Sequence, residues 1–152
     1  MNTLPSMVPF HTRFPDVAWP ETRSVSVYLA RQGLPVGEYA FVEYFCNEPG
    51  CDCRRVLFKV VSKSQPGEIL AVINFGWEAV AFYTRWLHGD EEGANEIVAA
   101  ALDPLNRQSR HAPALLDLFR KLWLPDQDYV ARQRRHYELF KRGGKRGRAK
   151  RH

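Results

Sequence analysis

The chain has 152 residues (17.6 kDa), 45% apolar and 26% charged. This composition excludes wholesale disorder, and the length suits one domain with a sizeable core. The formal net charge of +5 is uneven, because seven Lys and Arg and no acidic residue fall in Lys141–His152, leaving 15 basic and 17 acidic groups for the other 140 residues. The body is therefore slightly acidic, and the basic character belongs to the C-terminal tail.

No apolar run approaches the roughly 18 residues that a membrane-spanning helix needs. The N-terminus lacks the charged start and continuous apolar stretch of a signal peptide. The three cysteines are an odd number, which argues against a secreted disulfide framework. We therefore expect a cytoplasmic protein with reduced thiols, with a Cys46–Cys51 disulfide as the alternative under oxidising conditions.

Residues 1–23 contain four prolines and no clean periodicity, which predicts an irregular N-terminal arm. Phe10, Phe14 and Trp19 suggest that this arm packs onto the body. The next segment, Ser24–Arg31, fits either a strand or a short helix.

Three segments alternate in polarity as half-buried strands do: Glu38–Cys46, Arg54–Ser62 and Ile69–Phe75. The turns between them carry Pro49-Gly50 and Pro66-Gly67, pairs that suit tight turns. Short connections of this kind favour an antiparallel meander.

The period then changes to that of a helix. Helices are predicted over Glu78–His88, Asn95–Leu102 and Ala112–Leu124, and a last one, capped by Asp126 or Asp128, runs to about Arg142. Gly143, Gly144 and Gly147 argue against its continuation.

Strands first and helices afterwards indicate the α+β class. We expect a small antiparallel sheet of three or four strands, followed by three or four helices packed on one face. The predicted organisation is an irregular arm over 1–23, a single domain over 24–142 and a disordered basic tail over 143–152.

The cysteines occur as Cys46, Cys51 and Cys53, in the pattern C-x4-C-x-C between two predicted strands. A hairpin tip that gathers three sulfurs is typical of a zinc site, since zinc prefers tetrahedral thiolate and imidazole ligands. Arg54 and Arg55 would lower the thiol pKa values and offset the thiolate charge. The alternatives are buried cysteines that act as small apolar residues, or a redox pair.

A fourth ligand has to come from elsewhere. The candidates are His11, His88, His111, His136 and Asp52. We favour His136, because its helical spacing places it on an apolar face, although a hydrogen-bonded core histidine has the same pattern. Water as the fourth ligand would make the site catalytic, and a cysteine paired with His136 would be a nucleophile. Because no H-E-x-x-H motif is present, and no H-x-E with a following P-C-x-x-C, we favour a structural, non-enzymatic zinc site.

Together, the runs YFCNEPGCDCRRV, INFGWE and LDPLNRQS resemble a family of uncharacterised bacterial proteins. That family is loosely associated with proteins that carry the cysteine-rich SEC-C zinc module near their C-termini. The resemblance covers roughly residues 38–140, and this chain departs from it in having a basic tail without cysteine. It implies zinc and no particular activity.

The tail residues Lys141, Arg142, Lys145, Arg146, Arg148, Lys150 and Arg151 are interleaved with glycine, a pattern that favours RNA or another polyanion as partner. A solubilising tail without a partner is the alternative. The resulting hypothesis is a cytoplasmic zinc-binding module that acts as a binding or adaptor protein, with weak polyanion affinity. A metal-dependent enzyme and an RNA- or ribosome-associated protein are the rival hypotheses, and neither a protein partner nor a ligand is indicated.

Overall fold

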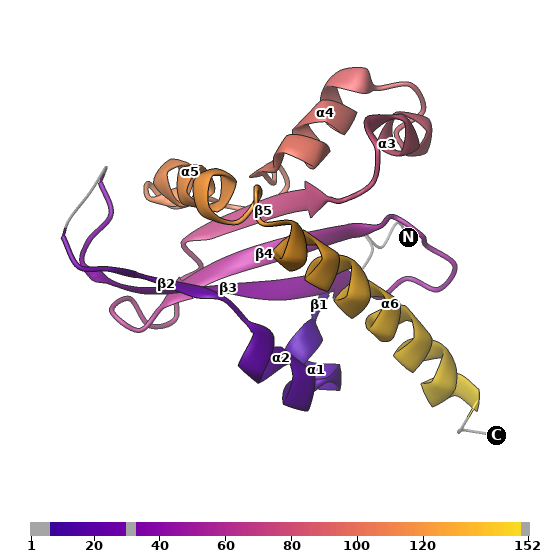
Figure 1. Cartoon of the computed structure of the whole chain (residues 1–152), viewed down its shortest axis with the longest axis horizontal. Helices are drawn as coiled ribbons and strands as arrows, with labels where there is room; N and C mark the ends of the chain where they lie inside the picture. Colours follow the sequence, from indigo (N-terminus) through magenta and orange to yellow (C-terminus); the bar gives the residue numbers. More distant parts are fainter. Residues whose placement is uncertain (1–6, 30–32, 150–152) are drawn as a thin grey trace.

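In a computed structural model, residues 7–29 and 33–149 are described, with side chains described up to residue 143. They form a six-stranded antiparallel sheet in the order β1-β3-β4-β5-β6, with β2 also paired to β3 (Figure 1). The strands are β1 (Met7–Pro9), β2 (Ser24–Val27), β3 (Gly37–Cys46), β4 (Arg55–Ser62), β5 (Ala71–Gly76) and β6 (Ala101–Leu102). The α+β prediction is confirmed.

The three predicted strands are confirmed as β3, β4 and β5, joined as an antiparallel meander. Alternate residues of β3, among them Tyr39, Phe41 and Phe45, are buried on one face, as the period of two requires. Phe41 lies opposite Val60 of β4, so the inward faces of the two strands coincide.

The helices are α1 (Phe10–Arg13), α2 (Pro15–Glu21), α3 (Val80–Trp86), α4 (Glu91–Ala99), α5 (Ala112–Leu122) and α6 (Gln127–Ala149). Figure 1 shows α5 and α6 crossing the front of the sheet, with α3 and α4 beyond β5. Aromatic contacts hold this layer: Phe119 of α5 packs on Phe58 (5.0 Å between ring centroids), and Phe140 of α6 packs on Phe45 (5.6 Å). The prediction of three or four strands and three or four helices was too low for both. It missed β1, β6, α1 and α2, and it left the segment of β2 open between a strand and a short helix.

The N-terminal segment is the largest difference from the sequence analysis, which predicted it to be irregular. β1 pairs with the end of β3, and Pro15 opens α2 at a first-turn position where proline is tolerated. Such elements show no periodicity, because each is only three to seven residues long. Phe10 is buried as expected, whereas Trp19 is 60% exposed.

Both boundaries of the predicted helix Asn95–Leu102 also differ from the structure. α4 begins at Glu91, not Asn95, because the Asp90 carboxylate accepts a hydrogen bond from the Gly93 N–H (2.9 Å) and so caps the helix. The predicted end of that helix is instead the strand β6, which pairs with β5. The ambiguous segment after α2 is the strand β2.

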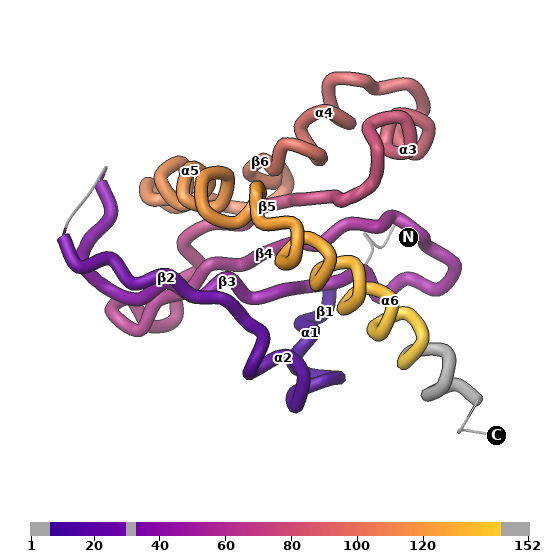
Figure 2. Tube along the Cα trace, in the orientation of Figure 1, coloured from indigo at the N-terminus to yellow at the C-terminus, as the bar shows by residue number. Residues whose placement is uncertain are grey.

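α6 continues to Ala149, beyond its predicted end near Arg142. Glycine costs a helix only about 1 kcal/mol per residue, so the glycines do not forbid this. The packing of α6 also explains why residue 143 is a glycine, since a Cβ there would lie 2.6 Å from the Phe14 ring. The backbone of 143–149 belongs to α6, whereas Lys150 and Arg151 lie outside the described residues, and the disorder of the free tail stays a prediction. Figure 2 traces how α6 crosses the sheet and extends past its edge.

No helix among the described residues is long and apolar enough to cross a membrane.

Candidate metal centre

The three cysteines meet at the hairpin between β3 and β4. Cys46 ends β3, and the loop returns through a turn in which the Cys51 N–H donates to the Glu48 carbonyl (3.2 Å). Gly50 occupies that turn with φ of 79°, a value that suits glycine. As a result, the Sγ atoms of Cys46, Cys51 and Cys53 all lie within 4.8 Å of one another. Cys46 and Cys53 are buried and Cys51 is half-buried, so only Cys51 lies on the solvent side.

Helix α6 holds this hairpin in place. The Lys141 ammonium donates to the Cys46 carbonyl oxygen (2.8 Å). The Tyr137 hydroxyl donates to Asp52 (2.9 Å) and accepts from the Arg54 N–H (3.2 Å). These two residues, one turn apart on α6, therefore fix both sides of the loop that carries Cys51 and Cys53.

A second anchor comes from α3. The Tyr83 hydroxyl donates to the Arg54 carbonyl (2.6 Å) and accepts from the Glu78 N–H (3.1 Å). Gly76 permits this approach, since a Cβ there would lie 2.2 Å from the Tyr83 hydroxyl oxygen. The missing Cβ of Gly76 is therefore what lets the Tyr83 hydroxyl reach the backbone of the cysteine loop.

The cluster is electrostatically asymmetric. A hydrogen bond from the Cys53 thiol, then one from the Glu48 N–H and the charge of Lys141, lower the pKa of Cys46 to about 5 despite its burial. The same hydrogen bond, together with burial, raises the pKa of Cys53, and burial raises the pKa of Cys51. Of the three thiols, that of Cys46 therefore loses its proton most readily.

Three sulfurs at this separation suit a thiophilic ion, because soft thiolate ligands select zinc and similar metals. A divalent ion bound by three thiolates carries a net charge of about −1. The Lys141 ammonium near Cys46 and the Arg55 guanidinium near Cys53 offset that charge.

The structure does not place His136 in this cluster. His136 is fully buried, and its Nδ1 lies 2.6 Å from Glu43 while its Nε2 lies 2.6 Å from Glu21. Because both ring nitrogens face carboxylates, neither has a free lone pair for a metal. The choice of His136 as fourth ligand is therefore wrong, whereas its place on a buried helical face is confirmed.

The other candidate ligands are also engaged or distant. His11 stacks on Trp19 (4.7 Å between centroids), and His111 Nδ1 lies 2.9 Å from the Gly33 carbonyl. His88 is exposed, and Asp52 is bound by Arg54 and Tyr137. Among the described residues, the cysteine trio is the only group of three or more such side chains able to hold a metal, so a fourth ligand would come from outside these residues.

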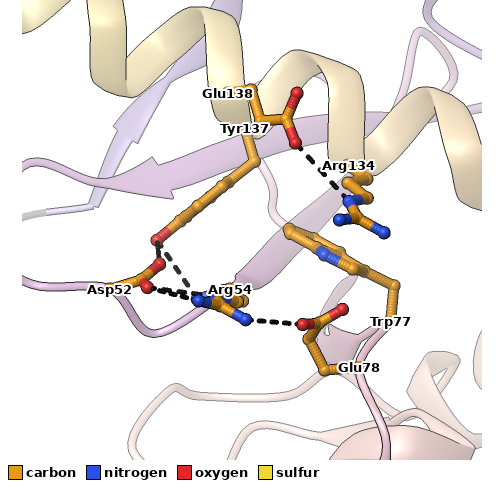
Figure 3. Close-up of a pocket in the computed structure, with 7 residues that line it drawn as sticks. All are labelled: Asp52, Arg54, Trp77, Glu78, Arg134, Tyr137 and Glu138. Atoms are coloured by element: carbon orange, nitrogen blue, oxygen red, sulfur yellow. Dashed lines mark hydrogen bonds and ion pairs between the residues drawn. The ribbon is translucent and has the colours of Figure 1, made fainter.

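A polar pocket of about 250 Å³ lies beside the hairpin (Figure 3). It is lined by Asp52, Arg54, Trp77, Glu78, Arg134, Tyr137 and Glu138. Figure 3 shows Tyr137 and Trp77 on opposite sides, with Arg54 between Asp52 and Glu78. Arg54 Nη1 bonds Glu78 at 2.6 Å, and Arg54 Nη2 bonds Asp52 at 2.9 Å. Asp52 and Arg54 flank Cys53, so the cysteine loop forms one wall of the pocket.

The basic tail is described only at its start. Lys141, grouped with the tail in the sequence, lies against Cys46, and Arg142 is exposed. The side chains of Lys145, Arg146 and Arg148, and all of Lys150 and Arg151, fall beyond what is described. Polyanion binding by the tail therefore stays a prediction.

Comparisons with protein-family models, curated proteins and solved structures gave no match. The resemblance to zinc-module proteins thus also stays a prediction.

Tyr137 and Lys141 are the contributors that the sequence did not reveal. Their spacing of four residues places them on one face of α6, but nothing local pairs that face with a hairpin some 85 to 95 residues earlier.

Proposed function

We propose that this chain binds one zinc ion through Cys46, Cys51 and Cys53, and that the metal holds the hairpin against α6. The observation that carries the proposal is the convergence of the three Sγ atoms within 4.8 Å. Cysteine is scarce in this chain, and packing alone gives no reason to gather all three in one loop. The nearby cations Lys141 and Arg55 match the charge that such a site would carry.

The proposed role is that of a binding module whose metal shapes a recognition surface. The cysteine loop supplies Asp52 and Arg54 to the polar pocket, so metal binding would fix that wall of the pocket. The chain would then act as an adaptor, in which the zinc stabilises the recognition surface and takes no part in a reaction. Metal binding adds to folding free energy in such small sites.

A metal-dependent enzyme is the second candidate, and one observation favours it. The described residues offer three ligands and no fourth, and three protein ligands with one open position are typical of catalytic zinc. Cys51 lies on the solvent side, from which an outside ligand would approach.

Cobalt substitution tests the proposal. Reduced, metal-free protein titrated with Co²⁺ should develop thiolate-to-cobalt charge-transfer absorption with an end point at one ion per chain. The d–d bands then report tetrahedral geometry. Adding a small anion or thiol should shift those bands if the fourth position is open, and should leave them unchanged if it is closed. Absence of the charge-transfer band at any Co²⁺ concentration would refute metal binding by the trio.

A further inference from the structure

The strand β2 lies at an edge of the sheet, with its inner side on β3. The Phe41 N–H donates to the Arg23 carbonyl (3.0 Å), and the register places Val25 opposite Tyr39. In an antiparallel pair, hydrogen-bonded residues alternate with residues whose N–H and C=O point away from the partner. The backbone groups of Ser24 and Ser26 therefore point outward, and no other strand of the described chain pairs with them.

This edge is protected only by the short length of β2, four residues, and not by the charges or proline that proteins also place on edge strands. Ser24–Val27 contains no charged residue and no proline. Directly after it, Tyr28 is 82% exposed and Leu29 is 72% exposed. Among the described residues, these are two of the eight large apolar side chains that are exposed, and they directly follow the edge strand.

We propose that β2 pairs antiparallel with β2 of a second copy of this chain, about a two-fold axis at Ser26. In this register Ser26 faces Ser26 of the partner subunit, and Ser24 faces Tyr28 of the partner subunit. The outward-facing groups of Ser24 and Ser26 are then the ones that form hydrogen bonds across the interface. The interface is independent of the metal centre.

A second copy fits this edge because the strand is complementary to itself. An antiparallel pair about a two-fold axis satisfies both free edges at once, and the uncharged segment brings no like charges together. Val25 and Val27 already pack against the core on the inner face, and the pairing places them beside their counterparts. The two sheets then continue as one, with Tyr28 of each subunit covered by the other.

Sedimentation velocity of the full chain over a range of concentrations tests the proposal. The wild type should sediment as a monomer–dimer mixture that shifts to dimer as concentration rises. Ser26→Pro should be monomeric, because proline has no N–H and its ring blocks the approach of a second strand. The Ser26 N–H points outward, so an unchanged melting temperature is expected when the variant is diluted.

A second variant keeps the test decisive if proline disturbs the strand. Ser26→Lys sets two ammonium groups opposite each other and should weaken dimerisation by about fivefold, the effect of an unfavourable cross-strand pair. Leu105→Lys is the matched control, since Leu105 is 77% exposed and follows β6, at the opposite end of the strand order. A wild type that stays monomeric at every concentration overturns the proposal. A dimer that Ser26→Pro and Ser26→Lys leave intact overturns it as well.

Engineered cysteines test the register. Under diamide, two thiols that lie within reach lose their hydrogens to the reagent and form a disulfide. Ser26→Cys should give a covalent dimer, since facing residues lie about 5.5 Å apart between Cα atoms. Ser24→Cys should do so only when mixed with Tyr28→Cys, and the wild type measures the background of the native thiols. Equal cross-linking of Ser24→Cys and Ser26→Cys alone would refute the register.

Discussion

Replacing His136 with alanine removes the centre of a buried ion cluster. His136 links Glu43 of β3, which is 4% exposed, to Glu21 of α2, and its ring stacks on Phe10 at 4.4 Å between centroids. The variant leaves the Glu43 carboxylate buried and without the His136 ring nitrogen that lies 2.6 Å from it. Breaking a buried pair in this way costs about 3–5 kcal/mol. This is a large share of the roughly 5–15 kcal/mol that holds a domain together.

The expected fall in melting temperature is about 6–20 °C for a domain of this size. Urea unfolding followed by circular dichroism measures the free energy of unfolding directly. Arg134→Ala is the matched control, because Arg134 lies on the same helix with 61% of its side chain exposed, and we expect a change within about 0.5 kcal/mol. The reasoning would be refuted by a His136→Ala loss below about 1 kcal/mol with an unchanged urea slope.

The same structure makes three further predictions. Burial raises the pKa of Glu21, but hydrogen bonds and charges of His136 and Arg135 lower it overall. The stability that Glu21 contributes is therefore complete above its ordinary pKa of 4.5 and is lost as the pH falls through the lower pKa of the folded state. The melting temperatures of the wild type and Glu21→Gln should therefore converge in acid. Melting temperatures that stay the same distance apart at every pH would contradict this. Tyr137→Phe leaves Asp52 and the Arg54 N–H without their partner and should cost about 1–3 kcal/mol in urea unfolding, whereas Tyr28→Phe, at an exposed hydroxyl, should cost nothing measurable. Gly76→Ala should cost about 1–3 kcal/mol, since its Cβ would lie 2.2 Å from the Tyr83 oxygen and 2.7 Å from Ile97; an unchanged melting temperature would refute that close packing.

The sequence predicted those parts of the fold that depend on regular local patterns. The meander β3-β4-β5 alternates strictly and carries turn residues between its strands, and α5 has a wide apolar stripe. β1, β2 and β6 are two to four residues long, and backbone pairing with distant strands holds them. Such pairing leaves no periodic signal in the sequence.

The candidate site likewise combines a local feature that the sequence predicted with long-range contacts that it did not. The cysteine cluster is local, eight residues long, and sequence spacing was enough to predict it. The partner of His136 was not local: Glu43 lies 93 residues away and Glu21 115 residues away. Helical spacing correctly indicated that His136 is buried, but a buried histidine can equally bind a metal or a carboxylate. Only the fold decides between the two, and here it places His136 between carboxylates.

The zinc content of the reduced protein, purified without chelator, tests the central claim most directly. We predict one zinc ion per chain in the wild type and in folded His136→Ala, and its loss in Cys51→Ser. Retention in His136→Ala separates the cysteine trio from the histidine that the sequence favoured. A wild type that contains no metal, or a Cys51→Ser variant with the same zinc content, would contradict the metal centre.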